Sequence, residues 1–230
     1  MTTNKDLAIQ KIEKEFEKLS NLILHQLSLL QDLLNKEVKA DRKEITKQLL
    51  ANEELIDKFE VHLDEKIVKV IVLYHPLATD LRRLFAIYHM TINLERVGDL
   101  VVKITNTYLE IEDQTIQHES ATTLQNMLKI ISKMVNRALL SFINSDVEFA
   151  NWTLNKDMEF DELNKKLLKK NIKSAGLPKE SQQTLNNLVD LRSIISSLER
   201  IGDHATNIAE SSIYSITGTI IRHQNPKTEN

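Results

Sequence analysis

The sequence predicts an all-α protein of two tandem, sequence-related three-helix bundles, with six long helices in all. Its 230 residues include only four glycines and three prolines, and 5% of them are aromatic, a composition typical of long helices. Apolar residues recur at three- and four-residue steps through most of the chain, which is the spacing of amphipathic helices. A six-residue block of the first half also recurs in the second half, which indicates an internal repeat.

The first half of the chain contains three amphipathic segments. The first covers residues 6–34, and the second follows a polar stretch at 39–43. Pro76 marks the end of the second segment, and because proline is tolerated in the first turn of a helix, we expect the third over about residues 75–109. Residues 110–119 lack periodicity and are predicted to form the linker between the repeats.

The second half repeats this organisation. Short connections between long helices favour antiparallel neighbours, so each repeat is expected to form an up-down-up bundle. One continuous six-helix array is the alternative. The predicted domains are residues 1–112 and 119–220, one three-helix repeat each, followed by a polar tail at 221–230. The expected elements of the second repeat are helices over residues 124–142, 147–172 and 181–216, a break at Gly176–Pro178, and Gly218 after the last helix.

The two repeats align at a constant offset of 104 residues. Leu-Glu-Arg-Val-Gly-Asp at 94–99 falls on Leu-Glu-Arg-Ile-Gly-Asp at 198–203. Two separate blocks that share one offset are hard to obtain by chance, so a duplicated structural unit is predicted. The same offset superposes acidic residues of the second helices, Glu53 on Asp157 and Asp57 on Asp161.

Each repeat carries one pair of carboxylates four residues apart on its second helix and another pair on its third. Residues at i and i+4 lie on one face of a helix, about one turn apart. Like charges at this spacing destabilise a helix by about 0.2–0.5 kcal/mol, which a bound cation would offset. Oxygen ligands suit magnesium, calcium, manganese or iron. The candidate metal ligands are Glu53, Asp57, Glu95 and Asp99 in the first repeat and Asp157, Asp161, Glu199 and Asp203 in the second.

Two of the four glycines, Gly98 and Gly202, stand at equivalent places directly before an aspartate of these pairs. Glycine inside a helix costs about 1 kcal/mol relative to alanine, so close approach by another group is inferred at both positions. A single acidic pair is most often a solvated helix edge, and the interpretation as a site therefore depends on the repeated set. Asn207 and Glu210, one and two turns beyond Asp203, are further candidate ligands.

Composition also excludes several classes of function. A net charge of −3 leaves no basic field, so nucleic acid is not expected as a partner. The absence of cysteine excludes disulfides and thiolate metal sites. There is no run of 18 apolar residues and no apolar N-terminal signal, so we expect a cytoplasmic protein without direct membrane insertion. No nucleophile–base pair or glycine-rich phosphate loop is present, and the chain is not predicted to be an enzyme.

Three segments of the sequence resemble PhoU proteins, and the likeness covers essentially the whole chain. They are residues 94–99, the extended counterpart Leu-Glu-Arg-Ile-Gly-Asp-His-Ala-Thr-Asn-Ile-Ala-Glu at 198–210, and His-Pro-Leu-Ala-Thr-Asp-Leu-Arg at 75–82. The resemblance implies two three-helix bundles whose Glu/Asp-x-x-x-Asp pairs bind multinuclear metal clusters. All four acidic pairs match that pattern. Iron is the metal that it implies first, with zinc, manganese or magnesium as alternatives.

The resemblance also implies a regulatory function. PhoU-like proteins act when phosphate is plentiful: they restrain the high-affinity phosphate ABC transporter and help its sensor histidine kinase to keep the phosphate-starvation response off. This protein would then be an adaptor between the transporter ATPase and the kinase, peripheral to the membrane through those proteins. The resemblance further implies a homodimer, which the long apolar stripes permit.

Three alternatives remain open from the sequence. Carboxylate-bridged di-iron enzymes also place acidic pairs on facing helices, but their sites usually include Glu-x-x-His, which is absent at these pairs. A structural helical adaptor could bind adventitious cations at its acidic edges. A PhoU-domain protein could also regulate another transporter or a stress response.

Overall fold

The computed structural model describes residues 3–35, 41–111, 113–157, 160 and 182–221, and within these ranges the structure is helical with no strand. The all-α prediction is confirmed. The fifth helix, expected over 147–172, is helical over 147–157, and the rest of it lies outside the described residues, as does the break at Gly176–Pro178. The other elements are α1 (Asn4–Leu34), α2 (Arg42–Tyr74), α3 (Ala78–Glu110), α4 (Gln114–Asn144) and α6 (Gln182–Thr217).

Local capping fixes where several helices begin and end. Helix α1 starts with a capping box, in which Asp6 N–H donates to Thr3 Oγ1 at 3.2 Å and Thr3 N–H donates to the Asp6 carboxylate at 2.9 Å. Asp41 caps α2 by accepting from Lys43 N–H at 2.9 Å. At the other end of α2, His75 takes a left-handed conformation with φ 46°. Gly218, with φ 75°, follows α6 as predicted.

Two predicted boundaries are wrong, and capping explains the more important one. The third helix does not include Pro76, because α3 begins at Ala78 with Leu77 as its N-cap. The expected linker at 110–119 is also too long, since α4 already begins at Gln114. Asp113 accepts hydrogen bonds from Thr115 N–H and Ile116 N–H, and this cap starts the helix well before its apolar periodicity does.

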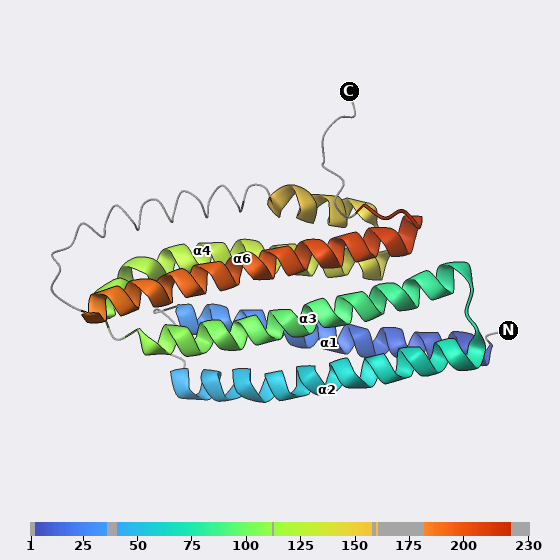
Figure 1. Cartoon of the computed structure of the whole chain (residues 1–230), viewed down its shortest axis with the longest axis horizontal. Helices are drawn as coiled ribbons and strands as arrows, with labels where there is room; N and C mark the ends of the chain where they lie inside the picture. The colour runs from blue at the N-terminus through green and yellow to red at the C-terminus, as the bar shows by residue number, and fades with distance from the viewer. Residues whose placement is uncertain (1–2, 36–40, 112, 158–159, 161–181, 222–230) are drawn as a thin grey trace, which may run out of the picture.

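The axes of the long helices are roughly aligned, and the helices form two groups, with α1, α2 and α3 in one and α4 and α6 in the other (Figure 1). Helix α3 packs against α6 and runs antiparallel to it, and α1 packs against α4. Among the described elements, α2 contacts α1 and α3 alone, so it lies on the outside of the first bundle. None of the described helices combines the length and apolar character needed to cross a membrane.

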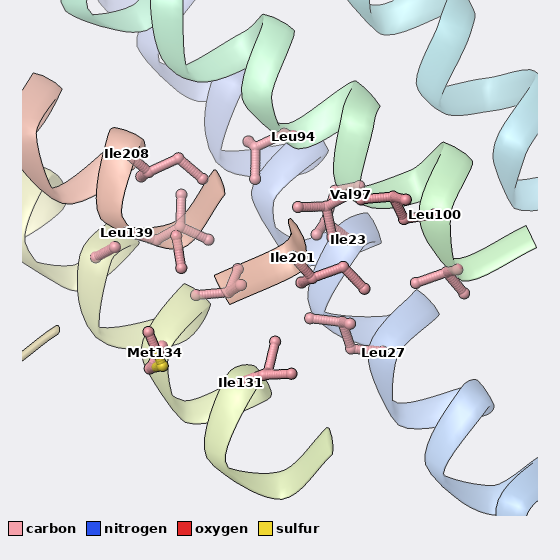
Figure 2. Packing of buried hydrophobic residues seen from close by; sticks show 14 of the residues in the cluster. Ile23, Leu27, Leu94, Val97, Leu100, Ile131, Met134, Leu139, Ile201 and Ile208 are labelled. Carbon is pink, nitrogen blue, oxygen red and sulfur yellow. The ribbon is translucent and has the colours of Figure 1, made fainter. Parts of the chain in front are cut away.

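The two bundles share one hydrophobic core. Buried side chains of both repeats form a single connected cluster. Figure 2 shows Ile23 and Leu27 of α1 with Val97 of α3, Ile131 of α4 and Ile201 of α6, all of which are at most 1% exposed. The first bundle therefore buries the side formed by α1 and α3 against α4 and α6 of the second repeat.

A polar contact fixes the register of α3 against α6 within this interface. Asn93 Oδ1 lies 2.9 Å from His204 Nδ1 and accepts a hydrogen bond from Asn207 Nδ2 at 3.2 Å. Asn93 Nδ2 in turn donates to the backbone carbonyl of His89 at 2.8 Å. Asn93 is separated from His204 by 111 positions in the sequence and from Asn207 by 114. The contact therefore joins the two repeats in one relative alignment.

Candidate metal centre

The four predicted ligands of the first repeat come together between α2 and α3. Burial raises the pKa of Glu53 to about 8, and the charges of Asp99, Asp57 and Glu95 add to this effect. Glu53 and Asp99 are also close enough to share a hydrogen bond, which requires a proton on one of the two carboxyls. Glu53 and Glu95 are half-buried, whereas Asp57 and Asp99 are exposed, so the group lies at the edge of the core.

The acidic group extends along α2 beyond the predicted ligands. Burial raises the pKa of Glu95 to about 7, and the charges of Asp99 and Glu60 raise it further. Arg96, whose Nε lies 3.5 Å from Glu95 Oε2, lowers this pKa. Burial also raises the pKa of Glu60 and that of Asp64, and the charges of Asp64 and Asp57 contribute at Glu60. Six carboxylates thus interact along the α2–α3 face with one nearby arginine.

Two neighbours hold the Glu53 carboxylate in this position. A Cβ at Gly98 would lie 2.7 Å from Glu53 Oε2 and 3.1 Å from Ile56 Cδ1, which explains why glycine occupies this place in a helix. Gln26 of α1 places Nε2 3.4 Å from the same Glu53 oxygen. Gln26 is not among the residues predicted from the sequence. The sequence pattern that could have identified Gln26 is a single amide within the apolar stripe of the first helix, one turn after Ile23.

The donor set fits a hard cation. Glu53 Oε1 is buried and has no hydrogen-bond donor, and the surrounding ligand atoms are carboxylate oxygens on two neighbouring helices. In the ranges that the structure describes, no three acidic or histidine side chains already stand where they could hold one ion. Binding would therefore require the exposed Asp57 and Asp99 side chains to turn toward Glu53 and Glu95, and the ligand role of all four stays a prediction.

The second repeat reproduces the central part of this arrangement. A Cβ at Gly202 would lie 3.7 Å from Asp157 Oδ1, just as Gly98 faces Glu53, so the predicted equivalence of the two acidic residues holds in space. Glu199 is half-buried and Asp203 exposed, matching Glu95 and Asp99. Asp161 lies outside the described residues.

The two further ligand candidates, Asn207 and Glu210, lie on the side of α6 that faces α3. Asn207 donates to Asn93 in the contact between the repeats. Glu210 lines a pocket of about 260 Å³ with Phe85 and His89 of α3 and Tyr214 of α6. The role of both residues as ligands also stays a prediction.

The fold and the site together define an all-α tandem-repeat protein. Carboxylates cluster between the second and third helices of its first repeat, and an aspartate faces the equivalent glycine in its second. The model of the PhoU domain matches residues 16–107 and 124–212. The chain therefore belongs to the PhoU family, with one such domain in each repeat.

Individual relatives match over nearly their whole length. A phosphate-specific transport system accessory protein PhoU homolog from Aquifex aeolicus is 30% identical over 220 residues, which cover 94% of this chain and 98% of that protein. Its counterpart from Pseudomonas aeruginosa is 28% identical over 228 residues, covering 96% and 93%.

Solved structures agree with the observed fold. The crystal structure of PhoU from Pseudomonas aeruginosa matches with a TM-score of 0.80 at 25% identity, covering 93% of this chain and 99% of that one. The phosphate transport system regulatory protein PhoU from Streptococcus pneumoniae matches with a TM-score of 0.77 at 26% identity, covering 94% and 99%. The tandem three-helix prediction is thus confirmed, and these relatives are named as accessory or regulatory proteins rather than as enzymes.

Proposed function

We propose that this protein is a negative regulator of phosphate uptake and of phosphate-starvation signalling. The observation that carries the proposal is membership of the PhoU family across both repeats, together with relatives named as accessory proteins of a phosphate-specific transport system. The protein acts by binding rather than by catalysis. It is an adaptor in the cytoplasm between the ATPase of the phosphate ABC transporter and its sensor histidine kinase, and it works as a homodimer.

Metal binding is part of the proposal. Glu53, Asp57, Glu95 and Asp99 would hold a cation in the first repeat, and Asp157, Asp161, Glu199 and Asp203 would do so in the second. A bound cation would neutralise the mutual repulsion that adds to the effect of burial in raising the pKa values of Glu53 and Glu95. Iron in a multinuclear cluster is the first choice, and zinc, manganese or magnesium are alternatives. The first site would join α2, on the outside of its bundle, to α3, and so stabilise the surface offered to partners.

A reporter of the phosphate-starvation response tests the regulatory proposal. In cells that lack the protein and grow in plentiful phosphate, the reporter should be on, and it should be off again when the protein is supplied. A reporter that stays off in cells without the protein would contradict the proposal and favour regulation of another transporter or of a stress response. Supplying a variant with Glu53→Gln and Asp99→Asn then tests whether the carboxylates are required.

A further inference from the structure

Gln26 is a fully buried polar side chain in the core-facing stripe of α1. Its exposed fraction is 0%, and its neighbours along the stripe, Ile23 and Leu30, are equally buried. An amide in such a place is costly unless it is hydrogen-bonded. Its Nε2 donates to the backbone carbonyl of Leu49 at 3.2 Å and to Glu53 Oε2 at 3.4 Å. Because both of these partners are acceptors, the nitrogen of the amide must face them.

Through Gln26, helix α1 also contacts the carboxylate group that lies between α2 and α3. Glu53 Oε2 is close both to the Gln26 amide of α1 and to the backbone of α3 at Gly98, so two helices limit the position of this oxygen. The other oxygen, Oε1, is buried without a hydrogen-bond donor. A carboxylate with one oxygen held by an amide donor has the arrangement of a metal ligand oriented by an outer neighbour.

Stability alone does not account for this glutamine. Its own Oε1 is buried without a partner, which is an unfavourable arrangement for folding. A methionine of nearly the same shape would fill the space without any polar group to satisfy. The amide therefore serves Glu53 at some cost in stability.

Packing places a methionine, Met134, in the corresponding position of the second repeat, although the offset of 104 residues would pair Gln26 with Ile130. The three nearest groups to a Cβ at Gly202 come from Asp157, Met134 and Phe160, with Met134 Cε at 3.9 Å. Thr153, the residue at the offset of 104 from Leu49, donates to the backbone carbonyl of Met134 at 3.3 Å, so residues 134 and 153 face one another as 26 and 49 do. A thioether cannot donate a hydrogen bond to a carboxylate. The two carboxylate groups are thus built differently.

We propose that Gln26 is a positioning residue of the first metal centre, which orients Glu53 for cation binding. The inference rests on the proposed metal binding. The natural test is Gln26→Met, because it gives the first centre the residue that the second one has.

The experiment measures Mn²⁺ binding to the full chain by electron paramagnetic resonance of the free ion. The parent protein carries Asp157→Asn and Asp203→Asn, so that the first centre is observed alone. In this background Gln26→Met should raise the Kd for Mn²⁺ by about 10- to 100-fold, the usual effect of losing an outer partner of a metal ligand. The melting temperature of the metal-free protein should stay the same or rise.

A matched control is Ser20→Ala. Ser20 is another buried polar residue of α1, but its Oγ donates to the backbone carbonyl of Phe16 within the same helix at 2.8 Å. This variant should leave the Kd for Mn²⁺ unchanged. If Gln26→Met also leaves the Kd unchanged while the parent binds Mn²⁺, the positioning role is overturned and the metal centre stands.

Two other results are equally decisive. A parent protein that binds no Mn²⁺ overturns the metal centre and the role of Gln26 with it. If Gln26→Met does not fold, Gln26→Asn takes its place, because it keeps an amide but withdraws it from Glu53 by one methylene. The same loss of Mn²⁺ affinity is then expected, and an unchanged Kd contradicts the proposal.

Discussion

The carboxylate of Glu53 occupies space that a side chain at position 98 would need, since a Cβ at Gly98 would lie 2.7 Å from Glu53 Oε2. The equivalent separation in the second repeat, from Gly202 to Asp157 Oδ1, is 3.7 Å, an ordinary contact. The longer glutamate side chain reaches deeper between its helices than aspartate does. A side chain at position 98 would therefore displace the Glu53 carboxylate, whereas one at position 202 would fit beside Asp157.

Replacing Gly98 by alanine should displace the Glu53 carboxylate without unfolding the bundle, because the end of that side chain can move. Alanine is favoured over glycine in a helix by about 1 kcal/mol, which offsets part of the steric cost. We expect little net change in the free energy of unfolding and a clear loss of Mn²⁺ affinity at the first centre, measured by urea unfolding and metal titration.

Gly202→Ala is the matched control for this variant. With 3.7 Å available to Asp157 and 3.9 Å to Met134, the new methyl group should fit, and the helix should gain about 1 kcal/mol of stability. Equal effects of the two substitutions on metal binding would contradict the steric account of Gly98.

The stability of the metal-free protein should fall as pH rises from about 6.5 to about 8. Burial and neighbouring carboxylates raise the pKa of Glu53 from 4.5 to about 8 and that of Glu95 from 4.5 to about 7. Between the ordinary pKa of 4.5 and the raised pKa, the folded chain holds protons that the unfolded chain has released. The stabilisation that these protons provide is full below the pKa of the unfolded chain and is lost as pH rises through the pKa of the folded chain.

The pH window is chosen to separate this effect from that of His204. Burial and the charges of Arg200 and Arg96 lower the pKa of His204 from 6.5 to about 4, so its contribution to stability is lost only as pH falls below its ordinary pKa of 6.5. Urea unfolding in the presence of a chelator measures the decline above that pH. Glu53→Gln should flatten most of the decline, and a parent protein whose stability rises over this window would refute the assignment.

Neutralising the first acidic group should lower the metal content without unfolding the protein. The test is one variant that combines Glu53→Gln, Asp57→Asn, Glu95→Gln and Asp99→Asn. It lacks the repulsion between like charges, so in the metal-free state it should resist urea at least as well as the parent. Elemental analysis of the purified proteins measures the loss. Glu54→Gln with Glu65→Gln, two exposed glutamates of α2, is the control that should retain the metal. Equal metal content in all three proteins would exclude the first centre.

Removing the polar contact between the repeats should destabilise the whole molecule. Asn93→Leu leaves the half-buried His204 and Asn207 without their shared acceptor, and the loss of two hydrogen bonds of about 0.5–1.5 kcal/mol each should cost about 1–3 kcal/mol. The free energy of unfolding measures the loss. Asn186→Leu, at an exposed position of α6, should change stability by no more than about 0.5 kcal/mol. Comparable effects of the two substitutions would show that the interface does not depend on Asn93.

Features that follow from periodicity and repetition could be predicted from the sequence. The three- and four-residue spacing predicts the helices, and the common offset pairs Gly98 with Gly202 and Glu53 with Asp157 without any knowledge of how the helices pack. The start of α4 could not be found in this way. It depends on the two hydrogen bonds that Asp113 accepts, and a cap leaves no periodic signal in the residues after it.

The sequence alone determined the helical repeat and the residue types of the acidic group, because both depend on patterns within one helix. The tertiary structure decided which side chains of different helices meet. No local rule connects Gln26 to Glu53, or Asn93 to His204, since these residues come together only when α1 packs on α2 and α3 packs on α6. The difference between the two carboxylate groups arises from such contacts between helices, and only packing in three dimensions specifies them.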